Sequence, residues 1–349
     1  MANSGNRIGH ETKFHAEKIK IAIVGLGRIA SLLEDDSLRE KPATHAGAVT
    51  ANPDCLLVAG CDIDEERRRL FARRWQVPVY ADAESMLAEH GPEILHIATH
   101  PDSHLFYCRL AASCGVPLVV CEKPLADNLK SARSIAALHQ SGKIKILTNH
   151  ERRYSADYIR MKEILDGGNL GALLGARACL YFGKNRRLNE MLWHDGTHLA
   201  DALMFLSGGF LKHERCWGSK LGGKTGTTWL VGSINSTGGG NSKASVPFVI
   251  ELGAGRDHLV FEMEFSCERG RLRIGNGIFE VWESDVSPYA EKFRSLKKTD
   301  ETFPGPTGCF AGMTADAAAC VRNRNRRPRS SALDGLAAVE YLQSVTGRI

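Results

Sequence analysis

The sequence has few of the features that mark membrane-bound, secreted or nucleic-acid-binding proteins. No stretch approaches the ~20 apolar residues needed to cross a bilayer, and the polar segment Met1–Lys20 lacks the apolar centre of a signal peptide. The net charge of +5 is small for 349 residues and is spread along the chain. We therefore expect no membrane partner and no nucleic-acid partner.

Paired cysteines are also missing, although the chain contains ten cysteines. None stands in a Cys-x-x-Cys pair, and several lie within apolar strand or helix patterns. A thiol in such a position behaves as a small hydrophobic side chain. We expect an enzyme of the reduced cytoplasm.

Apolar runs alternate with segments of helical spacing from residue 19 to residue 149. This alternation is typical of a doubly wound parallel sheet built from βαβ units. The predicted strands are Lys20–Val24, Leu56–Asp62, Ile94–Ala98, Pro117–Cys121 and Ile144–Thr148, and the predicted helices are Glu65–Arg74, His104–Cys114 and Asn128–His139. Residues 1–18 are polar and are predicted to form a flexible leader.

The pattern changes after Asn149. Helical patterns over Tyr154–Leu165 and Trp193–Leu206 end at glycine pairs. Between about residue 171 and residue 287 the segments alternate polar and apolar positions and are separated by turn signals. Residues 150–349 are therefore predicted to form a second α/β domain with an open, mainly antiparallel sheet and closing helices near Met313–Val321 and Leu333–Val345.

A glycine-rich turn follows the first predicted strand. Residues 25–30, Gly-Leu-Gly-Arg-Ile-Ala, have the Gly-x-Gly-x-x-Ala spacing that lets a backbone approach a pyrophosphate at a helix N-terminus. Asp62 ends the second strand, where a carboxylate can accept the ribose hydroxyls of an adenosine and repel a 2′-phosphate. An ordinary tight turn and a helix N-cap are the alternatives, and Asp64 fits the capping role equally well. The unusually long spacing between turn and acid predicts an insertion over Leu33–Thr44.

Glu122-Lys123-Pro124 follows the predicted strand Pro117–Cys121. A lysine before proline is held in an extended conformation. At this edge of the sheet its ammonium could hydrogen-bond a substrate hydroxyl and favour loss of the hydroxyl proton.

Together, the glycine turn, Ala98–His104 and Glu122-Lys123-Pro124 resemble the glucose–fructose oxidoreductase/inositol dehydrogenase (Gfo/Idh/MocA) family. Further matches are Arg152-Arg153-Tyr154, Gly196-x-His198 with Asp201, and Asp334-Gly335-Leu336. The resemblance covers roughly residues 19 to 346.

The resemblance implies a Rossmann domain over residues 19–149, a substrate-binding domain over residues 150–349, and hydride transfer between NAD(P) and a sugar, cyclitol or similar hydroxyl compound. Lys123 corresponds to the family's catalytic lysine and His198 to the histidine that usually accepts the proton. A homodimer or homotetramer is also implied. NAD, with NADP as the alternative, is expected to be bound by Gly25, Gly27, Arg28, Ile29, Asp62, Thr99, His100, His104 and Glu122.

The sequence departs from the family upstream of His198. Many members read Asp-x-Gly-x-His, whereas this chain has His194 where they have aspartate. On a continuous helix His194 and His198 would lie one turn apart on the same face. His194 is therefore a further catalytic candidate, and Asp195 or Asp201 is a candidate to orient His198.

The same segment allows other interpretations. His194 and His198 have the spacing of a zinc-binding helix, with Glu214 as a third ligand, but the Gly-Thr pair and the dinucleotide half argue against zinc. The two histidines could also be structural. We predict no metal.

Substrate contacts are expected from Arg153, Asp195 and Trp193, although a core role fits Trp193 equally well. The segment Lys184-Asn185-Arg186-Arg187 could bind an anionic substituent or form a solvated loop. We predict an NAD(P)-dependent dehydrogenase or reductase acting on CH–OH groups. The alternatives are a glycosidase that oxidises its substrate transiently with bound NAD and a non-catalytic dinucleotide sensor, which would need neither Lys123 nor His198.

Overall fold

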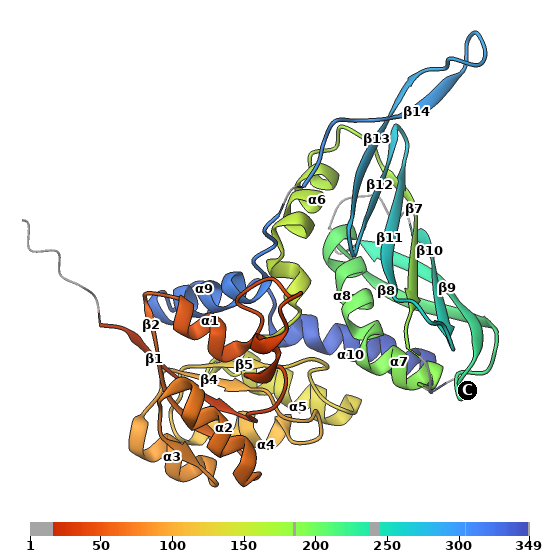
Figure 1. Cartoon of the computed structure of the whole chain (residues 1–349). Helices are drawn as coiled ribbons and strands as arrows, with labels where there is room; N and C mark the ends of the chain where they lie inside the picture. The colour runs from red at the N-terminus through yellow and green to blue at the C-terminus, as the bar shows by residue number, and fades with distance from the viewer. Residues whose placement is uncertain (1–16, 184–185, 237–244, 304, 348–349) are drawn as a thin grey trace, which may run out of the picture.

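The chain folds around two β-sheets (Figure 1). The computed structural model describes residues 17–183, 186–236, 245–303 and 305–347; Lys184, Asn185 and most of the predicted leader lie outside these ranges. None of the helices in these ranges is both long and apolar enough to span a bilayer.

The first sheet is parallel, with the strand order β3-β2-β1-β4-β5-β6. Strands β4 and β5 are buried along their whole length, as expected for parallel strands covered on both faces. The order reverses between β1 and β4, and a doubly wound sheet binds its ligand at this point. The strands are β1 (Ile19–Val24), β2 (Cys55–Cys61), β3 (Val79–Tyr80), β4 (Ile94–Ile97), β5 (Leu118–Cys121) and β6 (Lys145–Thr148).

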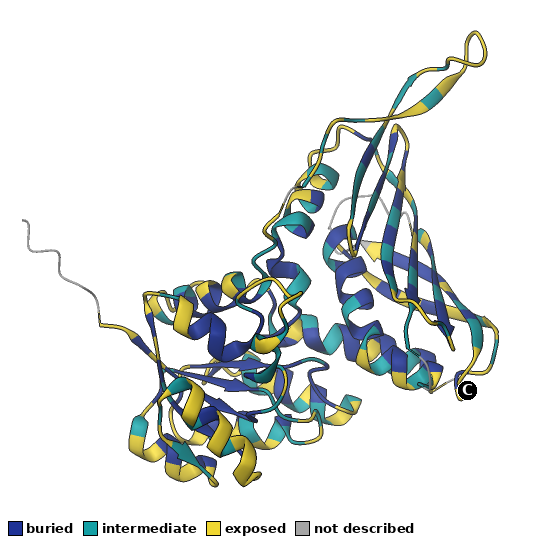
Figure 2. Cartoon of the chain, in the orientation of Figure 1, coloured by how far each residue is buried: buried dark blue, intermediate teal, exposed yellow. Residues whose placement is uncertain are grey.

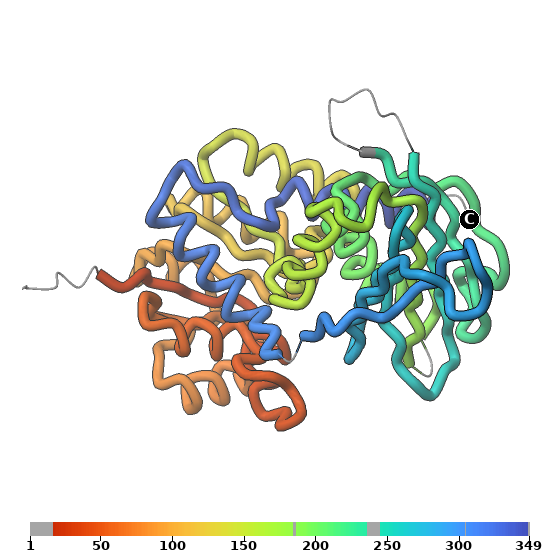
Figure 3. Tube along the Cα trace, turned by 90° about the horizontal axis from the view of Figure 1, so that it is seen from above, coloured from red at the N-terminus to blue at the C-terminus, as the bar shows by residue number. Residues whose placement is uncertain are grey.

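Helices cover both faces of this sheet. On one face pack α1 (His45–Ala51), α2 (Glu65–Trp75) and α9 (Cys309–Arg322). On the other pack α3 (Ala83–His90), α4 (His104–Ser113), α5 (Leu129–Gln140) and part of α10 (Ala332–Thr346). The two closing helices therefore return to the N-terminal domain, as Figure 3 shows.

The second sheet is mixed and mainly antiparallel, with the order β14-β13-β12-β11-β7-β10-β9-β8. Only the β7–β10 pair is parallel among its described strands. The strands are β7 (Leu173–Tyr181), β8 (Gly209–Gly218), β9 (Gly226–Ser236), β10 (Val246–Ala254), β11 (Val260–Cys267), β12 (Gly270–Gly275), β13 (Ile278–Val286) and β14 (Arg294–Lys298).

One face of this sheet is covered by α6 (Ala156–Asp166), α7 (Leu188–His194), α8 (Gly196–Ser207) and the second half of α10. The β13–β14 hairpin projects beyond the rest of the molecule and is largely exposed (Figure 2). Helix α10 supplies side chains to both hydrophobic cores, so it joins the two halves.

The structure confirms the predicted fold class and corrects two local expectations. The segment Trp193–Leu206 contains the predicted helix as α8, but His194 and His198 do not share one continuous helix, because α7 and α8 are separated at Asp195. The glycine turn leads into a short 3-10 helix, η1 (Leu32–Asp35), and not directly into an α-helix. After the insertion, His45 N donates to Ile29 O at 3.1 Å and Ala46 N donates to Ala30 O at 3.0 Å. These two bonds hold the start of α1 against the end of the glycine turn.

Candidate functional site

The glycine turn lies at the carboxyl ends of β1 and β4. Gly25 has φ +83°, and a Cβ there would meet the Ala98 carbonyl carbon and oxygen at 2.7 Å. Only glycine fits both the conformation and the approach to β4. At Gly27 a Cβ would meet nothing nearer than an Arg67 nitrogen at 3.8 Å. The turn is therefore uncrowded at its second glycine, where a phosphate can approach the backbone.

Asp62 is buried at the end of β2, 6% exposed. Its Oδ2 accepts a hydrogen bond from Leu26 N at 2.7 Å and its Oδ1 accepts one from Asp64 N at 2.9 Å. The carboxylate is therefore bonded directly to the glycine turn. The N-cap of α2 is Asp64, whose side chain accepts from Arg67 N, so the interpretation of Asp62 as that cap is wrong.

The loop after β4 borders the same edge of the sheet. Thr99 Oγ1 lies 2.7 Å from Ser103 Oγ, and His100 is exposed. The His104 ring is fully buried, with its two nitrogens each 3.2 Å from a carbonyl oxygen, those of Thr99 and Leu125. Burial lowers the pKa of His104 despite these contacts. His104 thus holds the loops after β4 and β5 together. Arg28 and Ile29 lie in the turn after Gly27, with Arg28 exposed.

The carboxylate of Glu122 points into the core behind Lys123. Glu122 Oε1 lies 2.8 Å from His45 Nε2 and accepts from Asn149 Nδ2 at 2.6 Å. His45 Nδ1 in turn lies 3.0 Å from His96 Nδ1. Burial raises the pKa of Glu122, but the bonds and charges of His45, Lys123 and Asn149 outweigh it and bring the pKa down to about 2. Glu122 is therefore a buried anion, held by residues far apart in the sequence.

Lys123 reaches from the first domain to the second. Its Nζ donates to the main-chain oxygen of His194 at 3.0 Å, and the side chain is partly exposed. The catalytic lysine candidate and the histidine segment are thus brought together, as the sequence predicts.

The junction of α7 and α8 places several charged groups beside Lys123. His194 ends α7 and is exposed, and Asp195 caps the junction. Asp195 Oδ1 lies 3.0 Å from His194 Nδ1, and its Oδ2 accepts from Arg186 Nη1 at 3.1 Å. Asp195 therefore contacts His194, the residue before it.

His198 lies in the first turn of α8. Its Nδ1 is buried, and no described residue forms a hydrogen bond with this nitrogen, so neither Asp195 nor Asp201 contacts His198 through Nδ1. Burial, together with the charges of Lys123 and Arg152, holds the pKa of His198 well below its usual value.

Arg153 is engaged in ion pairs. Its Nε donates to both carboxylate oxygens of Asp201 at 3.0 Å, and its Nη1 lies 2.9 Å from Asp334 Oδ1 at the start of α10. Asp201 also lies 2.8 Å from His150 Nδ1. Trp193 packs against both hydrophobic cores. The contacts of Arg153 and Trp193 therefore link the two domains next to the site.

Three residues of this arrangement, His45, His96 and Asn149, were not predicted from the sequence. His45 lies in a short helix of small residues with little periodicity, and its partners Glu122 and His96 are 77 and 51 positions away. The one available signal was a histidine within an apolar segment.

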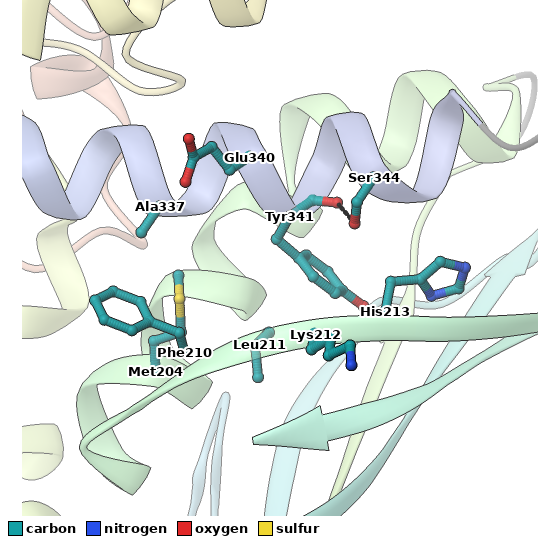
Figure 4. Close-up of a pocket in the computed structure, with 9 residues that line it drawn as sticks. All are labelled: Met204, Phe210, Leu211, Lys212, His213, Ala337, Glu340, Tyr341 and Ser344. Carbon is teal, nitrogen blue, oxygen red and sulfur yellow. Dashed lines mark hydrogen bonds between the residues drawn. The ribbon is translucent and has the colours of Figure 1, made fainter. Parts of the chain in front are cut away.

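Two other features lie outside this arrangement. The described residues contain no group of three or more His, Cys, Asp or Glu side chains able to hold a metal ion, and Glu214 accepts from Ser233 Oγ on the second sheet. A separate pocket lies between β8 and α10 and is lined by residues that include Phe210, His213 and Tyr341 (Figure 4).

The geometry at the glycine turn fits a dinucleotide. The turn tolerates no side chain at Gly25, is uncrowded at Gly27, and lies beside the buried carboxylate of Asp62. Residues 19–150 match the model of a family described as an oxidoreductase family with an NAD-binding Rossmann fold, the Gfo/Idh/MocA family.

The chain is similar to curated relatives over about half of their length or less. It is 25% identical to an inositol 2-dehydrogenase of Klebsiella pneumoniae over 193 residues, 54% of each chain. It is 27% identical to a D-apiose dehydrogenase of Paraburkholderia graminis over 164 residues, 44% of this chain and 43% of that protein.

The fold is also similar to that of a solved oxidoreductase from Agrobacterium radiobacter, in complex with NAD+, L-tartaric acid and magnesium. The TM-score is 0.69 at 16% identity, with 95% of this chain and 97% of that chain covered. The likeness extends through both domains.

Proposed function

Because residues 19–150 belong to the Gfo/Idh/MocA family of NAD-binding oxidoreductases, we propose that the whole protein is an NAD(P)-dependent dehydrogenase or reductase acting on CH–OH groups. The observation that carries the proposal is the hydrogen bond from Lys123 Nζ to His194 O. It brings a lysine at the end of a Rossmann strand together with the histidines of the second domain.

Bound NAD supplies a hydride acceptor at nicotinamide C4. The chain's own residues supply the rest of the chemistry. The Lys123 ammonium donates to the substrate oxygen and stabilises the negative charge that develops there. A histidine of the α7–α8 segment, His198 or His194, takes the hydroxyl proton.

The cofactor is proposed to be NAD in preference to NADP. The buried Asp62 carboxylate lies at the end of β2, where it would accept ribose hydroxyls and repel a 2′-phosphate. The nearest opposing charge is Arg67, with Nη1 3.7 Å from Asp62 Oδ2. The further proposed cofactor contacts are Gly25, Gly27, Arg28, Ile29, Thr99 and His100. The proposed roles of His104 and Glu122 are to hold the loops that surround the cofactor, because their side chains are buried and bonded to protein groups.

The substrate is proposed to be a sugar, cyclitol or similar polyol. Support comes from the names of the relatives, an inositol dehydrogenase and an apiose dehydrogenase. Asp195 is the proposed substrate contact nearest Lys123, and Trp193 and Arg153 shape the site from behind.

We also propose a homodimer or homotetramer located in the cytoplasm. The face of the second sheet that is left open by the described helices carries a row of opposite charges, in which Arg273 lies 3.2 Å from both Glu262 and Glu280. Buried thiols such as Cys108 and Cys121 support a reducing compartment. Sedimentation as a monomer would refute the proposed oligomeric state. Recovery of the protein outside the cytoplasmic fraction would refute the proposed location.

A panel of polyols and sugars, including myo-inositol and D-apiose, followed at the NADH absorbance band, tests the function. We expect net NADH formation with at least one member, whereas transient oxidation by a glycosidase would give none.

Lys123→Met should lower kcat by about 10²-fold or more while leaving NAD affinity within about twofold, because the side chain faces the substrate. The matched control is Lys130→Met, an exposed lysine on α5. A Lys123→Met enzyme that keeps most of its kcat would remove the lysine from the chemistry.

A further inference from the structure

His194 and Asp195 form an ordered pair at the end of α7. His194 Nδ1 lies 3.0 Å from Asp195 Oδ1, and the imidazole is 61% exposed. An ionised carboxylate only accepts hydrogen bonds, so Nδ1 carries the hydrogen. In the neutral ring Nε2 then has a lone pair, and no described residue donates a hydrogen bond to it. This nitrogen is therefore available to a substrate proton.

Asp195 is fixed and ionised. Arg186 Nη1 donates to its second oxygen at 3.1 Å. Burial acts to raise the pKa of Asp195, but the hydrogen bond to His194 and the charges of Lys123 and Arg186 bring the pKa below its ordinary value. A fixed carboxylate of this kind sets the tautomer of a histidine and stabilises its protonated form.

His198 lacks this support. Its Nδ1 is buried, and no described residue accepts a hydrogen bond from it, so this nitrogen has no acceptor that would fix the ring tautomer or share the charge of an imidazolium. Burial and the charges of Lys123 and Arg152 act further against protonation and keep its pKa well below the usual value. A ring whose charged form is disfavoured is a weak proton acceptor.

We propose that His194 Nε2, oriented by Asp195, is the proton acceptor of the reaction, in place of His198. This assignment rests on the dehydrogenase function proposed above. The Lys123 ammonium is bonded to the main-chain oxygen of His194 at 3.0 Å, so the group that meets the substrate oxygen is attached to the residue that takes its proton.

The step balances with NAD+ as oxidant. The substrate C–H bond would break, and its electron pair would pass as hydride to bound NAD+, the two-electron acceptor of the proposed function. The O–H electron pair becomes the second bond of the carbonyl, and the hydroxyl proton bonds to His194 Nε2. Asp195 stabilises the imidazolium, which returns the proton to water.

The kinetic test compares matched glutamine variants, with the most active alcohol of the panel as substrate. We expect His194→Gln to lower kcat by about 10²–10⁴-fold and His198→Gln by less than about tenfold. His258→Gln is the control, because His258 and Asp257 form the same adjacent pair, 2.8 Å apart, in the β10–β11 turn. Added imidazole should restore part of the activity of His194→Ala, because the side chain is exposed. A more severe loss in His198→Gln, or an equal loss in both variants, would overturn the assignment.

A second test uses the unliganded protein and needs no substrate. Nitrogen-15 NMR of the histidine side chains should find neutral His194 protonated at Nδ1, and Asp195→Asn should shift part of it to the other tautomer. A wild-type ring protonated at Nε2 would overturn the pairing. A panel without an active alcohol refutes the dehydrogenase function and this role together, whereas an active enzyme most damaged by His198→Gln refutes only the role of His194.

Discussion

Replacing Glu122 by glutamine should cost the protein about 3–5 kcal/mol of its free energy of unfolding. The carboxylate accepts from Asn149 Nδ2 at 2.6 Å and lies 2.8 Å from His45 Nε2. Both donors contact Oε1, so the glutamine oxygen can keep these two contacts. Its amide group then faces the main-chain N–H of Lys123, which donates to Oε2 at 3.2 Å, and the negative charge is lost. Removing one partner of a buried charged network typically costs this amount, because the remaining groups stay buried without a partner.

The acid dependence of stability gives an independent magnitude. The pKa of Glu122 is about 2 in the folded protein, against an ordinary value of 4.5. A depressed carboxyl pKa contributes stability that is present above the unfolded pKa and lost as pH falls through the folded pKa. The difference corresponds to about 3 kcal/mol, the lower end of the cost expected for the substitution. The stability difference between wild type and Glu122→Gln should therefore shrink between pH 4.5 and pH 2.

Urea unfolding of both proteins across this pH range is the measurement. Glu283→Gln is the control, because Glu283 is exposed on β13 and should change the free energy of unfolding by less than about 0.5 kcal/mol. A cost below about 1 kcal/mol at neutral pH, or a difference that does not change between pH 4.5 and pH 2, would show that Glu122 is not the buried anion described above.

Two further outcomes follow from the dinucleotide turn. Asp62→Ala should narrow the preference for NAD over NADP by at least about tenfold, or 1.4 kcal/mol, in fluorescence titrations, and a native enzyme that prefers NADP would contradict this. Gly25→Ala should destabilise the fold by about 3 kcal/mol and weaken NAD binding, because the residue has φ +83° and its Cβ would meet the Ala98 carbonyl at 2.7 Å. Gly91→Ala, at φ +51° with nothing within 4 Å, should cost only about 1 kcal/mol in the same unfolding assay, and equal costs would refute the steric argument.

The elements that the sequence predicts well are those whose signal is local. Continuous apolar runs predict β1, β2, β4, β5 and β6 to within one residue at most ends, because strands buried on both faces need no alternation. Strand β3 has only two residues, and β8 carries charges at Lys212, Glu214 and Arg215, so neither gives a clear pattern. Helix α1 lacks a periodic apolar stripe and was missed for that reason.

The candidate site was predictable in position but not in its internal contacts. The motif containing Lys123 and the segment from His194 to His198 indicated which residues meet. The orientation of Asp195 toward His194 depends on the break between α7 and α8, and a continuous helix would have placed the two side chains differently. The support of Glu122 by His45 depends on how α1 packs after the insertion, which sequence spacing does not reveal.

Helices α9 and α10 are the last described elements to be synthesised, although they pack on a domain whose first strand begins at Ile19. Side chains such as Phe310 and Met313 of α9 complete one core of the parallel sheet, and Ala332 and Val339 of α10 complete the other. Until these helices are synthesised, apolar surface on both faces of the nascent sheet stays in water. The N-terminal domain therefore completes its two hydrophobic cores, and reaches its final stability, only after α9 and α10 have been synthesised.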